Sequence, residues 1–238
     1  MSTLTQLSHV HRFIPATSPR KPPLLLLHGT GGDENDLVPL GQAVAPGAAL
    51  LSPRGKVLEG GRPRFFRRLA EGVFDEEDIR RRANELADFV EDAREVYGLQ
   101  APVALGFSNG ANIAAAVLQL RPEVLAGAVL LRAMVPLKEP PQADLEGKRV
   151  LMLSGAADPI VPAENAARLV SVLKRAGAIV DLRTVPVGHN LSQADLTITK
   201  AWLHAASEPN GTNGPLMPEI HEYAPHAVYG GPQGVSRE

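Results

Sequence analysis

Short apolar runs alternate along the chain with longer segments in which apolar and polar positions recur at helical spacing. The run LLLLH at 24–28 has no polar position before its last residue, as expected for a strand buried on both faces of a sheet. Similar runs predict strands at 48–53, 103–107, 126–131, 149–155 and 179–187. Helices are predicted between them at 36–45, 76–97, 109–120, 163–176 and 192–206. This alternation predicts an α/β fold in which a doubly wound, mostly parallel sheet carries helices on both faces.

The predicted elements end near residue 206, where the composition changes. Residues 1–206 are expected to form one domain, because no insertion is long enough for a separate lid domain. Residues 207–238 are rich in proline and glycine and show neither helical nor strand periodicity. Such a tail is either disordered or an arm docked on its own or a neighbouring subunit, and its apolar residues slightly favour the arm.

The composition is that of a globular domain without a strong charge bias. Of the 238 residues, 44% are hydrophobic, which is enough for a substantial core, and the formal net charge is −2. That charge gives no reason to expect nucleic acid or an anionic membrane as a partner. Arginines are dense at 61–69 and 78–84, where the neighbouring acids lead us to expect a solvated surface with salt bridges.

The chain has no cysteine, which excludes disulfides, thiolate metal ligands and a cysteine nucleophile. The N-terminal region contains no apolar stretch of signal-peptide length, and PLLLLHG at 23–29 is far too short to span a bilayer. We therefore expect a soluble cytoplasmic protein with no integral membrane segment, and we predict no metal site.

Residues 106–110, GFSNG, match the pattern G-x-S-x-G between a predicted strand and a predicted helix. In a nucleophile elbow the serine occupies a strained turn, and the flanking glycines leave room for it. The amides at the start of the following helix then point toward the group that the hydroxyl attacks. Ser108 is therefore a candidate nucleophile. The alternative is an ordinary strand-to-helix turn that contains a serine.

A serine hydroxyl needs a base, and the base needs an orienting carboxylate. Of the seven histidines, His189 alone falls in a loop after the last predicted strand, at the sheet edge where open α/β sheets handle ligands. Asp158 lies in the loop after the strand predicted at 149–155. The resulting order, Ser108, Asp158 and His189, is that of α/β-hydrolases.

Other titratable residues near these positions are expected to be structural. Asp181 lies at the start of a predicted strand and Asp195 at a turn into a helix. His28 ends a strand and is expected to brace a loop, whereas His9 and His11 are expected to precede the fold.

Acyl transfer also needs hydrogen-bond donors for the developing oxyanion. The backbone N–H of Asn109, directly after Ser108, is one candidate, and that of Thr30 in the glycine-rich loop after strand 24–28 is the other. The same loop begins like the dinucleotide fingerprint G-x-G-x-x-G. Its sixth position is Glu34, whose carboxylate would repel a pyrophosphate, so nucleotide binding is not expected.

Four segments, LLLLHGTGGDENDLVPLG, GFSNGANIA, SGAADPIVP and VGHNLS, together resemble the phospholipase/carboxylesterase family of α/β-hydrolases. Within it they look most like the bacterial branch of hydroquinone-associated (MhqD-like) carboxylesterases, and RFFRRLAEGVFDEEDI fits that branch too. The resemblance covers about residues 10–206. It implies an α/β-hydrolase fold, Ser108, Asp158 and His189 as the catalytic triad, and Thr30 and Asn109 as the oxyanion hole. It also implies a small hydrolase that has no lid, needs no cofactor and often forms a homodimer.

The resemblance implies a serine carboxylesterase that cleaves short- to medium-chain esters of small molecules through an acyl-enzyme on Ser108. A lysophospholipase or acyl thioesterase would share these residues, but relatives that deacylate proteins usually carry glutamine where this chain has Asn109. The alternative from another class is a non-catalytic α/β binding scaffold. Arg67 or Arg132 could meet a substrate carboxylate, or could simply pair with a surface acid.

Apolar walls for a substrate pocket are harder to locate. Aromatic residues make up only 4% of the chain, yet several gather before the helix predicted at 76–97. Phe65, Phe66 and Phe74 are candidates for this reason, and Met134 is another because it follows strand 126–131 at the expected catalytic edge. Packing in the core is the alternative for all four.

Overall fold

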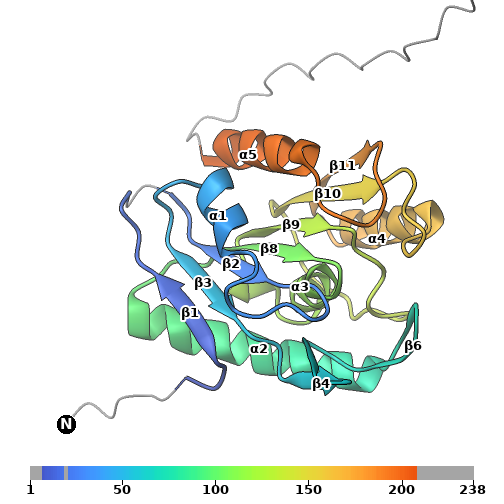
Figure 1. The fold of residues 1–238 in the computed structure, drawn as a ribbon, viewed down its shortest axis with the longest axis horizontal. Helices are drawn as coiled ribbons and strands as arrows, with labels where there is room; N and C mark the ends of the chain where they lie inside the picture. Colours follow the sequence, from blue (N-terminus) through green and yellow to red (C-terminus); the bar gives the residue numbers. More distant parts are fainter. Residues whose placement is uncertain (1–6, 19–20, 208–238) are drawn as a thin grey trace, which may run out of the picture. The chain divides into compact units, whose positions relative to one another are not determined.

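A seven-stranded sheet forms the centre of the computed structural model, which describes residues 7–18 and 21–207 (Figure 1). Its strands follow the order β1-β3-β2-β8-β9-β10-β11, and every neighbouring pair is parallel except β1 with β3. The bounds are β1 His11–Ile14, β2 Leu24–Leu27, β3 Leu50–Pro53, β8 Val103–Phe107, β9 Gly127–Leu131, β10 Arg149–Gly155 and β11 Ile179–Val185. The predicted mostly parallel, doubly wound sheet is confirmed.

Helices cover both faces of the sheet, as predicted (Figure 1). One face carries α1 (Val38–Val44) and α5 (Gln193–Ser207), which contact each other. The other face carries α2 (Glu76–Tyr97), α3 (Asn109–Leu120) and α4 (Ala163–Arg175), and a short 3-10 helix (Pro122–Val124) follows α3. The ends of the predicted helices and strands agree with these bounds within a residue or two.

Alternation along the buried strands explains why the apolar runs are continuous. Leu24 and Leu26 of β2 pack into the core under α1 and α5, whereas Leu25 and Leu27 pack into the core under α2, α3 and α4. Successive side chains of a strand point to opposite faces, so a strand covered on both faces needs apolar residues at every position.

The first strand of the sheet was not predicted, and the expectation that His9 and His11 precede the fold is wrong. His11 lies in β1, where its Nε2 is 2.8 Å from the hydroxyl oxygen of Tyr97. His9 is buried, and its ring centroid lies 4.7 Å from that of Phe89. β1 is short and half-exposed at the edge of the sheet, so it lacks the continuous apolar run that identified the central strands.

Two short hairpins between β3 and α2 were also not predicted. They consist of β4 (Val57–Glu59) with β5 (Arg62–Arg64), and β6 (Arg68–Ala70) with β7 (Val73–Phe74). Gly60 and Gly61 connect β4 to β5 with φ angles of 58° and 78°. A glycine pair at a two-residue turn is a hairpin signal, because both positions need positive φ. No separate lid domain is present among the described residues.

The tail expected at 207–238 lies outside the described residues, apart from Ser207 at the end of α5. None of the helices in the described part of the chain has the length and apolarity needed to cross a bilayer.

Candidate active site

Ser108 lies in a strained turn between β8 and α3, with φ 50° and ψ −113°. A non-glycine residue rarely adopts positive φ, and such strain is typical of functional turns. The flanking glycines are required by space. A Cβ on Gly106 would lie 2.5 Å from the carbonyl oxygen of Gly110, and one on Gly110 would lie 1.9 Å from that of Leu27. The pattern G-x-S-x-G therefore allows α3 to pack directly against β2 behind Ser108.

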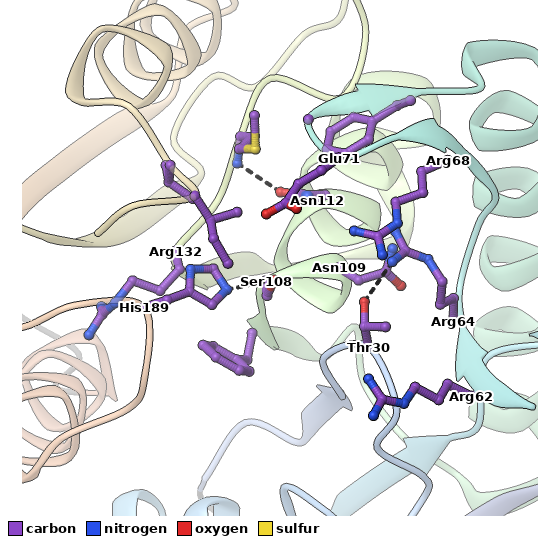
Figure 2. A pocket seen from close by; sticks show the side chains of 16 residues that line it. Thr30, Arg62, Arg64, Arg68, Glu71, Ser108, Asn109, Asn112, Arg132 and His189 are labelled. Atoms are coloured by element: carbon purple, nitrogen blue, oxygen red, sulfur yellow. Dashed lines mark hydrogen bonds between the residues drawn. The ribbon is translucent and has the colours of Figure 1, made fainter. Parts of the chain in front are cut away.

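The structure brings Ser108, His189 and Asp158 together (Figure 2 shows the first two). Nε2 of His189 is 2.9 Å from Oγ of Ser108, and Nδ1 of His189 is 2.9 Å from Oδ2 of Asp158. The Asp158 side chain is only 1% exposed, and its Oδ1 accepts hydrogen bonds from the amides of Ile160 and Val161. This arrangement holds the ring with Nδ1–H toward the carboxylate, which leaves Nε2 free to accept the serine proton.

Two backbone amides beside Ser108 have no acceptor within the described residues, those of Thr30 and Asn109. Asn109 is the first residue of α3, where the helix leaves its amides unpaired and its dipole is positive. Thr30 lies in the turn after β2, and the next residue, Gly31, donates from its amide to the carbonyl of Pro63. Thr30 and Asn109 therefore each offer an unpaired N–H group of the kind that binds an oxyanion.

The side chains of two asparagines hold the loops around the serine. Oδ1 of Asn109 accepts from the amide of Phe65 at 2.7 Å, and Oδ1 of Asn112 accepts from the amide of Met134 at 2.7 Å. Both asparagines are buried. Their roles were not predicted, because nothing in the sequence indicates which backbone amide a distant side chain will meet.

A buried arginine holds the loop that carries His189. Arg132 is fully buried with φ 59°, and its guanidinium donates to the carbonyl oxygens of Gly188 and Asn190, the two neighbours of His189. The same guanidinium pairs with both oxygens of Asp195 at 2.8 and 2.9 Å. The expectation that Asp195 is structural agrees with this pair, and Arg132 is saturated by protein groups although it borders the pocket.

The pocket above Ser108 has a volume of about 330 Å³. Its apolar lining includes Phe74, Phe107 and Met134. Phe65 and Phe66 instead lie in the core, 3% and 0% exposed. They face the core because their segment is held against α2 and α3. The aromatic residues that are close in the sequence therefore point in different directions, some into the core and some into the pocket.

The polar lining of the pocket differs from the predicted surface. The arginine-rich segment 61–69 was expected to be a solvated surface with salt bridges. Ion pairs form there as expected. However, Arg64 is buried, and it lines the pocket together with Arg62 and Arg68. Arg67 lies outside the lining and pairs with Asp75. The two hairpins direct these arginines toward the pocket. Their direction was not predicted from the sequence, because the hairpins themselves were not predicted.

His28 braces the loop after β2, as expected. Burial lowers the pKa of His28 below its usual value. Its Nε2 accepts from the amide of Gly55 at 3.0 Å, and its Nδ1 lies 2.7 Å from the carbonyl oxygen of Gly29. A neutral ring with Nδ1–H satisfies both contacts. In residues 7–18 and 21–207, no group of three or more His, Cys, Asp or Glu side chains could hold a metal ion.

A mostly parallel sheet with this strand order, carrying a serine turn after β8 and a histidine loop after β11, defines an α/β-hydrolase. The chain belongs to the phospholipase/carboxylesterase family, whose model matches residues 9–207.

Relatives of known name agree with this assignment. The chain is 43% identical over 185 residues to MhqD of Bacillus subtilis (strain 168), a protein named as a hydrolase, and this covers 77% of this chain and 92% of MhqD. It resembles the crystal structure of a Bacillus cereus carboxylesterase with a TM-score of 0.82 and 44% identity, covering 84% of this chain and 95% of that one. A Mesorhizobium loti carboxylesterase structure gives a TM-score of 0.80 and 37% identity, covering 84% and 97%. These similarities support ester hydrolysis by this chain.

Proposed function

We propose that the protein is a serine carboxylesterase that cleaves short- to medium-chain carboxylic esters through an acyl-enzyme on Ser108. The observation that carries the proposal is the hydrogen-bonded series Ser108 Oγ, His189 Nε2, His189 Nδ1 and Asp158 Oδ2, with 2.9 Å at each contact between residues. A serine hydroxyl within reach of an oriented, neutral imidazole is the arrangement that nucleophilic acyl transfer needs.

In the first half of the reaction, His189 Nε2 takes the proton of Ser108 as Oγ attacks the ester carbonyl carbon. Asp158 stabilises the imidazolium that forms. The amides of Thr30 and Asn109 donate to the oxyanion, and each such donor contributes roughly 2.7–4 kcal/mol of transition-state stabilisation. The tetrahedral intermediate then collapses, His189 gives its proton to the alcohol oxygen, and the alcohol leaves the acyl group on Ser108.

The second half repeats the first with water. His189 takes a proton from water, the hydroxide attacks the acyl carbon, and the same amides hold the oxyanion. The carboxylic acid leaves, and Ser108 recovers its proton from His189. The chain's own residues supply every proton transfer, so we propose that no cofactor takes part.

The size of the pocket supports the proposed preference for short- to medium-chain esters over long-chain substrates. A volume of about 330 Å³ lies near the lower end of ordinary ligand pockets, roughly 300–1,000 Å³. Lysophospholipids and acyl thioesters would use the same catalytic groups, so we place them second as candidate substrates.

We further propose that the protein works in the cytoplasm on a small-molecule substrate, without nucleic acid, from a domain spanning 1–206. The predicted homodimer can be checked by light scattering.

Replacement of the nucleophile tests the proposal. The variant Ser108→Ala should lose hydrolysis of p-nitrophenyl butyrate by about four to six orders of magnitude in kcat/KM while keeping its circular dichroism spectrum. Ser171→Ala is the matched control, because Ser171 is exposed on α4 and, within residues 7–18 and 21–207, its hydroxyl donates only to the carbonyl oxygen of Ala167. Turnover by Ser108→Ala near that of the control would contradict the mechanism.

A further inference from the structure

The cationic side of the pocket is not used by the proposed reaction. Arg62, Arg64 and Arg68 line it from the β4–β5 and β6–β7 hairpins (Figure 2). Ester hydrolysis on Ser108 needs the triad and two amides, none of which requires three guanidinium groups. A neutral ester would also leave these charges facing an apolar acyl chain, which is unfavourable.

Arg64 is the central member of this group. Its side chain is 3% exposed, yet it borders the pocket. Nη1 donates to Oγ1 of Thr30 at 2.8 Å, and Nε donates to the carbonyl oxygen of Phe66 at 3.2 Å. Nη2 has no acceptor among the described residues. Burial lowers the pKa of Arg64 from its usual value, and the nearby Arg68 charge acts in the same direction. Nη2 is therefore a free donor at the wall of the pocket, where a ligand can accept its hydrogen bond.

The neighbouring charges leave an excess of one positive charge. A single carboxylate, Glu59, serves two guanidiniums, at 3.3 Å from Arg64 Nε and 2.8 Å from Arg68 Nη2. Arg62 has no ion pair within the described part of the chain. Glu71 is the one acid among the described lining residues. Three arginines against Glu59 and Glu71 give a net charge of about +1, which suits a monoanion better than a dianion.

The position of the arginines indicates which half of the ester carries the anion. Figure 2 shows His189 on one side of Ser108 and Arg64 and Arg68 on the other. The leaving alcohol oxygen must lie beside His189, because that residue protonates it. The acyl chain, attached to the opposite side of the carbonyl carbon, then extends toward the arginines.

We propose that the preferred substrates are monoesters of short dicarboxylic acids, whose free carboxylate is bound by Arg64 with Arg62 and Arg68 beside it. This inference rests on the proposed esterase function. Monoester and water give the alcohol and the dicarboxylic acid, whose second carboxyl group ionises and releases one proton. Because a hydrogen bond to a charged group contributes about 1.5–3 kcal/mol, we expect about a 10- to 150-fold preference over a neutral ester of equal size.

Matched esters measure this preference directly. Monoethyl succinate and ethyl levulinate have the same acyl length, but the first ends in a carboxylate and the second in a methyl ketone. Proton release at constant pH gives kcat/KM for each, and monoethyl malonate, glutarate and adipate define the chain length. The charged ester should be preferred at least about tenfold, and salt should weaken the preference because partly exposed charges are screened. Equal rates across the series would overturn the inference.

Variants assign the preference to the arginines. Arg64→Gln should lower the ratio of charged to neutral kcat/KM at least about tenfold. Arg67→Gln is the matched control, since it removes the same charge from the same segment outside the pocket, and its ratio should equal that of the wild type. If Arg64→Gln does not fold, Arg62→Gln at an exposed position should still lower the ratio severalfold. An unchanged ratio in the folded variants contradicts the inference.

Three further outcomes are distinguishable. Faster hydrolysis of acetoxyacetate, which carries its carboxylate on the alcohol side, than of monoethyl succinate would overturn the placement of the anion in the acyl half. Loss of activity on every ester, charged or neutral, would instead contradict the proposed function itself. Activity on ethyl levulinate without preference for monoethyl succinate would leave the esterase proposal standing and overturn only the dicarboxylate inference.

Discussion

Removal of the Asp195 carboxylate should damage both stability and the position of His189. In Asp195→Ala the guanidinium of Arg132, which is fully buried, loses its ionic partner. Breaking a buried ion pair from one side costs about 3–5 kcal/mol, because the remaining charge is left unpaired in a low-dielectric interior. The same guanidinium holds the carbonyl groups of Gly188 and Asn190, so the loop carrying His189 should shift as Arg132 seeks new partners.

Urea unfolding and steady-state kinetics measure the two effects separately. Asp195→Ala should lose about 3–5 kcal/mol of unfolding free energy. Its kcat, measured at a temperature where the variant is folded, should fall about 10- to 100-fold with little change in KM, because small misplacements of a catalytic group are costly. Asp195→Asn keeps the shape and should recover part of kcat.

The control for this prediction is Asp181→Ala. Asp181 pairs with Arg183 at the same 2.8 Å, but the two side chains are 37% and 46% exposed. An exposed pair contributes about 0–1 kcal/mol, so this variant should behave like the wild type. Equal stability losses in the two variants would refute the burial argument. A destabilised Asp195→Ala with unchanged kcat would refute the positioning argument alone.

Three other substitutions test the structure. Gly110→Ala would place a Cβ 1.9 Å from the carbonyl oxygen of Leu27. Activity on p-nitrophenyl butyrate should collapse, and the urea midpoint should fall by the equivalent of about 1–3 kcal/mol of unfolding free energy. A wild-type midpoint would contradict the close packing. Asn109→Ala leaves the buried Phe65 amide without an acceptor, so about 1–3 kcal/mol of unfolding free energy should be lost. Ser108 should still react with acylating reagents. An unchanged urea midpoint would contradict a stabilising role for the Asn109 side chain. Burial, with Lys56 and Arg82 nearby, lowers the pKa of His9 from 6.5 to about 3. As the pH falls below 6.5, the unfolded chain therefore takes up a proton on His9 before the folded chain does. The free energy of unfolding should decline between pH 6.5 and pH 3 by about 1.4 kcal/mol per pH unit. In His9→Gln this part of the decline should vanish; identical pH profiles of wild type and variant would contradict it.

The sequence predicted the six parallel strands of the sheet and the five helices, because their periodicity reflects burial on one or both faces. It placed Ser108, Asp158 and His189 in loops that a parallel sheet brings to one edge, and the structure brings these three side chains within hydrogen-bonding distance. The expected mechanism follows from loop order, which topology converts into proximity. For that reason the candidate site could be located without knowledge of any contact.

The parts that the sequence did not predict depend on contacts between distant residues. Arg132 and Asp195 are 63 positions apart, and neither local spacing nor periodicity connects them. The arginines of the two hairpins point into the pocket because β4–β5 and β6–β7 alternate their faces, but strands of two or three residues leave no readable period. The pair Gly60–Gly61 was the available signal for the first hairpin. A hairpin predicted there would have made the arginines beside Arg67, not Arg67 itself, the candidates for binding a substrate carboxylate.

Mass spectrometry after reaction with a fluorophosphonate shows directly whether Ser108 is an activated nucleophile. The reagent forms a stable bond to an activated serine oxygen, so we expect one adduct per chain, located by peptide mapping at Ser108. Ser108→Ala should show none, and His189→Asn should react far more slowly because the hydroxyl loses the base 2.9 Å away. Absence of an adduct, or an adduct that persists in Ser108→Ala, would contradict the assignment of Ser108 as the nucleophile.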